Sequence, residues 1–167
     1  MRLIEGDAEI DDLDAFLDDL NAVAADHGVT VQAFDARYVV GRTHLERAVE
    51  LADRAIARGE NVARERGVEI LLYAAGRRQI DDALAMGVSE GKTPVVVLVS
   101  DADGDGSAEQ AAAEAVTELL DPGETLETTD AERVRSFFDI TEAELAAVDG
   151  DLADLVAERV ALLDVEK

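Results

Sequence analysis

A run of hydrogen-bond donors directly follows a glycine near the middle of the chain. Arg77, Arg78 and Gln79 carry guanidinium and amide groups, and Gly76 allows the backbone to approach a ligand closely. Unpaired RNA bases are bound by hydrogen bonds to their edges and by stacking on aromatic or guanidinium planes. These residue types therefore suit a contact with a single-stranded RNA end. The alternative is a pair of solvated loop arginines followed by Gln79 as a helix cap.

Two nearby side chains could supply a stacking plane for a base. Tyr73 precedes the glycine by three positions, and Arg64 lies further toward the N-terminus. Tyr73 stands in an apolar stretch, so a place in the hydrophobic core is the simpler interpretation of that residue.

Two other motifs resemble ligand-binding loops but depart from their spacing. Residues 87–93 (GVSEGKT) look like a phosphate-binding loop, which needs four residues between its glycines where this chain has three. Asp101, Asp103 and Asp105 imitate the start of a calcium loop, but Ala112 stands where that loop needs a glutamate. We therefore expect ordinary turns at both places, with no metal site and no cofactor.

The sequence lacks the groupings that indicate catalysis. His27 and His44 form neither a metal-spaced pair nor part of a nucleophile signature, and the chain has no cysteine. Carboxylate pairs are frequent, but in so acidic a chain they discriminate nothing. We expect a protein that is not an enzyme, and a small α/β enzyme with an unrecognised site remains the alternative.

Acidic residues dominate the composition. The 167 residues include 39 Asp and Glu against 15 Lys and Arg, a formal net charge of −24, while 48% are hydrophobic. Disordered chains combine high charge with low hydrophobicity, so this composition indicates a folded protein with an acidic surface. Lys92 and Lys167 are the only lysines. The composition resembles that of halophilic archaeal proteins, whose acidic surfaces keep them soluble in molar salt.

Targeting signals and membrane segments are not recognisable in the sequence. No signal peptide precedes the first acidic helix, and no apolar run approaches the roughly 20 residues that a membrane-spanning helix needs. We expect a soluble, cytoplasmic protein. An acidic protein that binds a basic partner is the alternative explanation of the charge.

The charge is unevenly distributed along the chain. Residues 37–92 contain 10 basic and 9 acidic residues, whereas residues 1–36 contain 1 and 10 and residues 93–167 contain 4 and 20. Arginines kept in the near-neutral segment, in a chain that otherwise favours acids, indicate that a binding function lies there.

Hydrophobic periodicity and capping residues predict alternating helices and strands. Helices are expected from Asp11 or Asp12 to Gly28, from Thr43 to Gly59, at 61–66 as a short turn, at 79–86 and 107–120, after Asp130 and Thr141, and at 152–165. Strands are expected at 29–34, at 94–100 and near 124–128, and residues 68–75 fit a helix better than a strand. These elements predict an α/β fold, a single helix-rich domain over residues 1–167 packed around a small mixed β-sheet.

A family resemblance covers most of the chain. It rests on residues 35–41 (DARYVVG), on 43–45 (THL) at a helix start, on 69–80 (EILLYAAGRRQI), and on 83–87 (ALAMG) before an apolar strand. This pattern resembles the small regulatory subunit of the KEOPS complex, the kinase-binding family related to the eukaryal PRPK-binding protein. The departures are acidic substitutions and the Asp-rich loop at 101–106.

The resemblance implies a non-catalytic role. Family members bind the kinase-like ATPase of the complex, and archaeal ones bind tRNA, chiefly its 3′ CCA end, which supports threonylcarbamoyladenosine modification of tRNA. Arg77, Arg78 and Gln79 are then the candidate tRNA contacts, with Arg64 and Tyr73 beside them. A kinase-binding protein without RNA contact is the alternative.

The final helix is the candidate surface for the kinase. Leu155, Leu162 and Leu163 recur on it as an apolar stripe, which could face the partner. Packing of the stripe into the protein's own core is the default interpretation.

Overall fold

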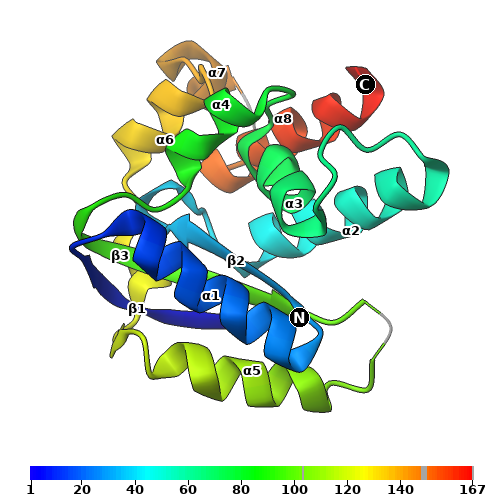
Figure 1. The fold of residues 1–167 in the computed structure, drawn as a ribbon. Helices are drawn as coiled ribbons and strands as arrows, with labels where there is room; N and C mark the ends of the chain where they lie inside the picture. The colour runs from blue at the N-terminus through cyan, green and yellow to red at the C-terminus, as the bar shows by residue number, and fades with distance from the viewer. Residues whose placement is uncertain (103, 148–149, 167) are drawn as a thin grey trace. The chain divides into compact units, whose positions relative to one another are not determined.

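The computed structural model describes residues 1–102, 104–147 and 150–166, and its strands are interspersed with helices, as expected (Figure 1). The chain separates into two units by its internal contacts. The first comprises Met1–Ala36 and Gly87–Thr128, and the second comprises Arg37–Met86 and the chain from Thr129 onward. The predicted α/β class is confirmed, while the single domain stays a prediction.

The first unit is a four-stranded sheet with two helices. Its elements are β1 (Arg2–Ile10), α1 (Leu13–His27), β2 (Thr30–Asp35), β3 (Gly91–Ser100), α5 (Ser107–Thr117), β4 (Asp121–Pro122) and the 3₁₀ helix η3 (Thr125–Thr128). The strand order is β2-β3-β1-β4 and every pairing is antiparallel, so the expectation of a mixed sheet is wrong. The segments β1-α1-β2 and β3-α5-β4 each connect two parallel strands, and one strand of the other segment lies between those two strands. This is a split βαβ arrangement.

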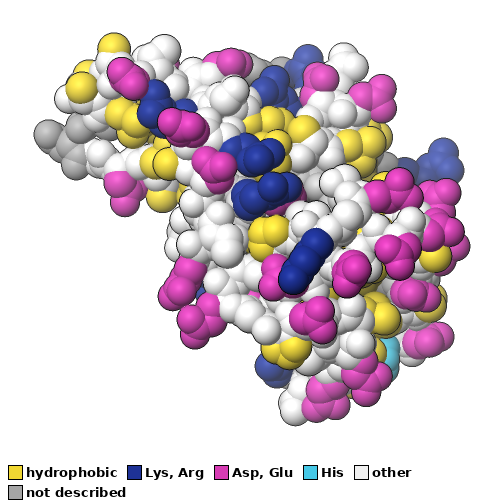
Figure 2. Space-filling view, turned by 90° about the vertical axis from the view of Figure 1, so that its left-hand side faces the viewer, with side chains coloured by type: hydrophobic (Ala, Val, Ile, Leu, Met, Phe, Trp, Pro, Cys, Tyr) yellow, Lys and Arg dark blue, Asp and Glu magenta, His cyan; other side chains and the backbone are white. Residues whose placement is uncertain are grey.

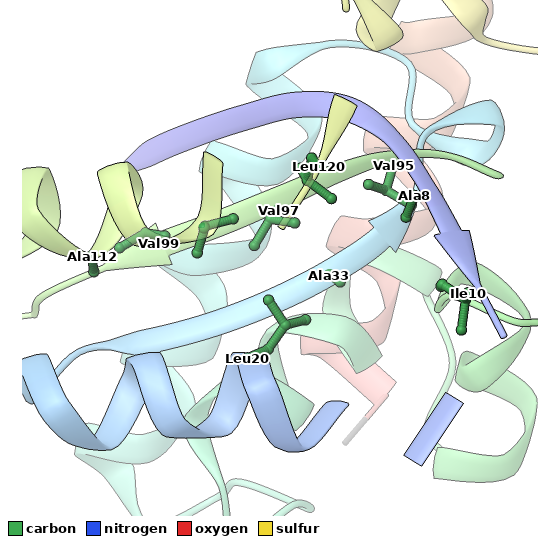
Figure 3. Close-up of a cluster of buried hydrophobic side chains, with 10 residues drawn as sticks. Ala8, Ile10, Leu20, Ala33, Val95, Val97, Val99, Ala112 and Leu120 are labelled. Atoms are coloured by element: carbon green, nitrogen blue, oxygen red, sulfur yellow. The ribbon is translucent and has the colours of Figure 1, made fainter. Parts of the chain in front are cut away.

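The core of this unit lies between one face of the sheet and the helices α1 and α5 (Figures 1 and 3). Alternate residues of the strands point to this face because successive side chains of a strand point to opposite sides. The buried cluster consists of Ala8, Ile10, Leu20, Ala33, Val95, Val97, Val99, Ala112, Val116 and Leu120. Strand β3 is buried throughout from Val95 to Ser100, as its continuous apolar sequence predicted.

Strand β1 is an element that the sequence prediction missed. It pairs with β3 along its whole length and with β4 at Gly6 and Asp7. A Cβ atom at Gly6 would lie 2.6 Å from the backbone oxygen of Asp121, so only glycine permits this approach of the strands. The strand predicted near 124–128 is misplaced, since residues 125–128 form η3 and the edge strand β4 lies just before them.

The second unit consists of helices. They are α2 (Arg42–Arg58), α3 (Arg66–Ala75), α4 (Ile80–Ala83), the 3₁₀ helix η2 (Leu84–Met86), α6 (Ala131–Phe137), α7 (Glu142–Ala147) and α8 (Leu152–Glu166). The 3₁₀ turn η1 (Ala36–Tyr38) leads into this unit, and residues 62–65 form bends in place of the predicted helical turn. Helix α3 packs against α2 and α8.

Helix α3 is the centre of the second unit. All residues from Glu69 to Ala75 are buried, because the helix is apolar on every side and only surrounding elements can cover it. The preference for a helix at 68–75 is therefore confirmed. Gly76 ends the helix with a φ of 61°, a conformation that glycine adopts without strain.

Candidate functional site

The residues after α3 begin with an arginine that is fixed in place. The guanidinium of Arg77 donates a hydrogen bond to the carbonyl oxygen of Phe137, the last residue of α6. Its central carbon also lies 4.7 Å from the centre of the Phe137 ring. Arg77 is half-buried, and these two contacts hold the end of α6 against the end of α3.

Arg78 and Gln79 are exposed. Gln79 occupies the position before α4, and its backbone oxygen accepts a hydrogen bond from the Ala83 N–H at 3.1 Å. Its side chain makes no capping hydrogen bond, so the amide group is not used to start the helix. Of the three predicted donors, these two are the ones that extend into solvent.

Tyr73 is part of the core and not a stacking plane. Its ring is completely buried, and its hydroxyl donates a hydrogen bond to Oδ1 of Asp164 on α8 at 3.1 Å. Burial, together with this carboxylate, raises the pKa of Tyr73 above its usual range. The proposed stacking role of this residue is therefore corrected, since no face of the ring is accessible to a base.

Arg64 is exposed but lies away from the donor segment. It precedes the first turn of α3, whereas Arg77 follows the last turn. Ten helical residues span about 15 Å at 1.5 Å per residue, so the two arginines lie at opposite ends of the helix. The structure does not bring them to one site.

The kinase candidates on α8 divide into buried and exposed residues. Leu155 and Leu163 are 3% and 4% exposed and belong to the core, which corrects their assignment to a partner surface. Leu162 is 47% exposed, and Val165, which the sequence analysis did not single out, is 80% exposed. Together with Ala161 they border a hollow of about 300 Å³ on the outer side of α8.

A second hollow connects the two predicted surfaces. It has a volume of about 180 Å³, and its lining includes Gly76, Arg77 and Leu162. Arg159 borders it and is held by the Phe138 carbonyl oxygen at 3.1 Å and by a Glu144 carboxylate oxygen at 2.7 Å. The donor segment after α3 and the apolar face of α8 are therefore neighbours within the second unit.

Tyr38 and Phe137 form an aromatic pair that sequence reasoning did not find. Their ring centres are 5.4 Å apart at an angle of 74°, and both rings are half-buried. Arg133 lies over the Tyr38 ring at 5.6 Å, and Arg77 lies over the Phe137 ring. The pair could not be found from spacing because the two rings are far apart in the chain.

His44 joins α2 to α3 and is not available as a base. Its Nδ1 atom accepts a hydrogen bond from the Val40 N–H at 3.3 Å, so the proton is on Nε2, which donates to the Ala74 carbonyl oxygen at 2.8 Å. Burial lowers the pKa of His44 to about 4. The residue borders a pocket of about 380 Å³, but both ring nitrogens are occupied by the protein.

Where they are described, the first loop motif leads from bends at 87 and 90 into β3, and the second contains bends at 102, 104 and 106. Gly91, Lys92 and Thr93 belong to β3, and so do not open a helix as a phosphate-binding loop would. The Asp105 carboxylate accepts hydrogen bonds from Ser107, which lower its pKa, while Asp103 lies outside the described residues. Among the described residues, no three His, Asp or Glu side chains are grouped to hold a metal ion.

Within residues 1–102, 104–147 and 150–166, no helix combines the length and the apolar composition needed to cross a bilayer.

The fold and these surfaces define a helix-rich α/β protein whose second unit presents arginine, aromatic and apolar side chains around shallow hollows. The sequence profile of the family described as kinase binding protein CGI-121 matches residues 12–164. The chain belongs to this kinase-binding family, which confirms the resemblance seen in residues 69–80. A search of curated proteins found no match to the chain.

Proposed function

We propose that the protein is a non-catalytic accessory subunit of the KEOPS complex that binds both the kinase-like ATPase subunit and the 3′ CCA end of tRNA. In this role it supports threonylcarbamoyladenosine modification of tRNA without contributing catalytic residues. The kinase-binding part rests on the family to which the chain belongs. The tRNA part rests on one observation: Arg78 and Gln79 are exposed directly after the Gly76 turn, beside an Arg77 that is already oriented.

The charge of the surface supports a contact through base edges. On the face drawn in Figure 2, acidic side chains are spread widely and the few Lys and Arg side chains stand in small groups with apolar side chains near them. Several arginines of α2 and α3 are used in ion pairs, such as Arg66 with Asp53 at 2.7 Å and Arg47 with Glu50 at 2.8 Å. A face without a broad basic field favours binding by hydrogen bonds and stacking over binding by phosphate neutralisation.

The tRNA contact is tested by charge reversal at the exposed arginine. We expect Arg78→Glu to abolish binding of the isolated protein to intact tRNA at molar KCl, and we expect tRNA lacking its CCA end to bind poorly to the wild type. Arg58→Glu is the matched control, because Arg58 is exposed at the end of α2 next to the segment that precedes α3. Arg78 is preferred to Arg77 for this test, since loss of Arg77 would also release the end of α6.

The outcomes of this experiment separate the alternatives. Unchanged affinity of Arg78→Glu would remove the donor segment from the proposal. A wild-type protein that binds the kinase-like subunit but not tRNA would be a purely structural kinase-binding protein.

The kinase surface is tested on the outer side of α8. We expect Leu162→Asp combined with Val165→Asp to prevent co-purification with the kinase-like ATPase, because both side chains are exposed and apolar. Leu17→Asp on α1 is the control, as Leu17 is an exposed leucine of the first unit. Co-purification that survives the double substitution would exclude this face as the interface.

A further inference from the structure

The Tyr38 and Phe137 rings belong to a surface that the tRNA contact predicted from the sequence does not include. Arg133, Tyr38, Phe137 and Arg77 follow one another as neighbouring planar groups, with a guanidinium at each end and two aromatic rings between. The chain has only two tyrosines, four phenylalanines and no tryptophan. Two of these few aromatic rings, both half-buried, therefore lie next to each other.

The backbone holds this arrangement in place. The Asp130 N–H donates to the Arg37 carbonyl oxygen at 2.9 Å, and the Thr129 hydroxyl donates to the Val39 carbonyl oxygen. These two bonds fix the residues on either side of Tyr38 against the start of α6, the helix that carries Arg133 and Phe137. The rings are thus oriented before any ligand arrives, which reduces the entropy lost on binding.

An open hollow of about 470 Å³ lies beside the rings. It is lined by Tyr38, Asp130, Glu132, Arg133, Ser136 and Phe137. Its volume falls in the range of small-molecule sites. The hollow therefore has room for a planar group next to the Tyr38 ring and the Arg133 guanidinium.

Arg133 is less constrained than the arginines that have structural roles. Arg159 binds two carbonyl oxygens and a carboxylate, whereas the buried Nε–H of Arg133 has no hydrogen-bond acceptor among the described residues. Its nearest ion-pair contact is Asp130 Oδ2 at 3.7 Å. The protein therefore satisfies fewer of the guanidinium's hydrogen-bond donors at Arg133 than at Arg159.

We propose that an unpaired nucleobase at the single-stranded end of an RNA stacks against the surface formed by the Tyr38 ring and the Arg133 guanidinium. This inference rests on the proposed tRNA-binding function and places its stacking plane at Tyr38, in place of Tyr73 or Arg64. Arg77 connects the plane to the donor segment, because it lies over Phe137 and is followed directly by Arg78 and Gln79.

The charges around the hollow favour a base over a phosphate. Asp130 and Glu132 line it, and their carboxylates would repel a phosphate group. A base carries no net charge, and its flat faces stack on tyrosine and arginine with little dependence on sequence. Such stacking also persists at salt concentrations that weaken phosphate contacts.

The experiment measures binding of tRNA to the full-length protein with Tyr38→Leu, Tyr38→Phe and Arg133→Lys. Tyr38→Leu removes the ring but keeps an apolar side chain, Tyr38→Phe keeps the ring, and Arg133→Lys keeps the charge but removes the planar group. We expect Tyr38→Leu to weaken binding by roughly 5- to 150-fold, the range found when single stacking groups are removed. Tyr38→Phe retains wild-type affinity, and Arg133→Lys shows a smaller loss than Tyr38→Leu.

Two fluorescence signals report stacking directly. A tRNA with 2-aminopurine in place of its terminal adenine is quenched by the wild type and by Tyr38→Phe, but not by Tyr38→Leu. Tyrosine emission of the wild type falls on binding and does not fall in Tyr38→Phe, because Tyr73 is buried and no tryptophan is present. Arg133→Lys leaves Tyr38 in place and serves as the test if Tyr38→Leu does not fold.

The results distinguish failure of this inference from failure of the proposed function. Undiminished tRNA affinity of both Tyr38→Leu and Arg133→Lys, with binding still lost in Arg78→Glu, would overturn the inference alone. Loss of kinase binding with intact tRNA binding in Tyr38→Leu would assign the rings to a protein partner and would also overturn it. A wild type that does not bind tRNA would overturn the proposed function and the inference with it.

Discussion

Two buried polar side chains, Glu69 and His44, join separate segments of the second unit. Glu69 is completely buried in α3, and its Oε1 atom accepts hydrogen bonds from the backbone N–H groups of Val62 and Ala63 at 3.0 and 2.8 Å. It thereby fixes the segment that leads from α2 into α3. His44 makes the corresponding connection between the start of α2 and the end of α3. Both residues belong to the motifs that carry the family resemblance, and the structure gives them positioning roles.

His44 makes stability depend on pH. Its pKa is about 4 in the folded protein and about 6.5 when exposed, so between these values the unfolded chain binds the proton more readily. The free energy of unfolding therefore keeps its full value, as far as His44 is concerned, above about pH 6.5, and it decreases as the pH falls toward 4. We expect the loss to reach roughly 3 kcal/mol, measured by urea unfolding at a series of pH values.

The variant His44→Gln separates this effect from the titration of the many carboxylates. The stability difference between wild type and variant should shrink as the pH falls from 7 to 4. A difference that stays constant over that range would show that His44 titrates at a similar pH in both states.

At the scale of elements, the end of α3 is packed against both α6 and α8. Gly76 has a φ of 61°, and a Cβ atom there would lie 3.4 Å from the carbonyl oxygen of Arg159 and 3.6 Å from the Phe138 ring. Arg77 binds the end of α6 directly after this turn. The position of the exposed donors Arg78 and Gln79 is therefore set by the way in which α3, α6 and α8 meet.

Gly76→Ala should destabilise the protein through backbone strain. An L-residue in the left-handed conformation costs roughly 1–2 kcal/mol. The added Cβ atom would make only ordinary van der Waals contacts with Arg159 and Phe138. Gly59→Ala at the end of α2 is the matched control, since Gly59 has a φ of 71° but open space around its Cβ position. We expect the free energy of unfolding to fall by similar amounts for Gly76→Ala and Gly59→Ala, because both positions have the same kind of backbone strain. A much larger loss for Gly76→Ala in urea denaturation would show that packing around its Cβ position adds to that strain.

At the scale of the whole molecule, the net charge of −24 opposes folding at low ionic strength. Charges of one sign repel each other over about 10 Å at 0.1 M salt, but over only about 3 Å at 1 M. We expect the Tm to rise by several degrees as KCl increases from low to molar concentration. Thermal unfolding followed by circular dichroism measures this change, and a halophilic origin stays a prediction.

Sucrose is the control for the salt experiment, because it strengthens apolar burial without screening charge. A Tm that responds equally to sucrose and to KCl at matched water activity would argue against charge repulsion as the cause.

Local patterns predicted most of the helices and the central strand correctly. Helix α1 begins after Asp12, whose carboxylate accepts a hydrogen bond from the Ala15 N–H, and ends at Gly28, as expected. Strand β1 was missed because its buried positions are filled partly by Gly6 and Ala8, which give a weak apolar alternation between acidic residues. Glycine is required at position 6 by the approach of β4, and that approach is not visible in the local sequence.

The sequence by itself determined the family, the α/β class, the Gly76 turn and the donors that follow it, because these depend on residues close together in the chain. Only the tertiary structure decided which side chains of the apolar helices are buried. It placed Tyr73, Leu155 and Leu163 in the core and left Leu162 exposed. It also brought Tyr38 beside Phe137. These outcomes depend on how helices pack, and packing is set by contacts between residues far apart in sequence.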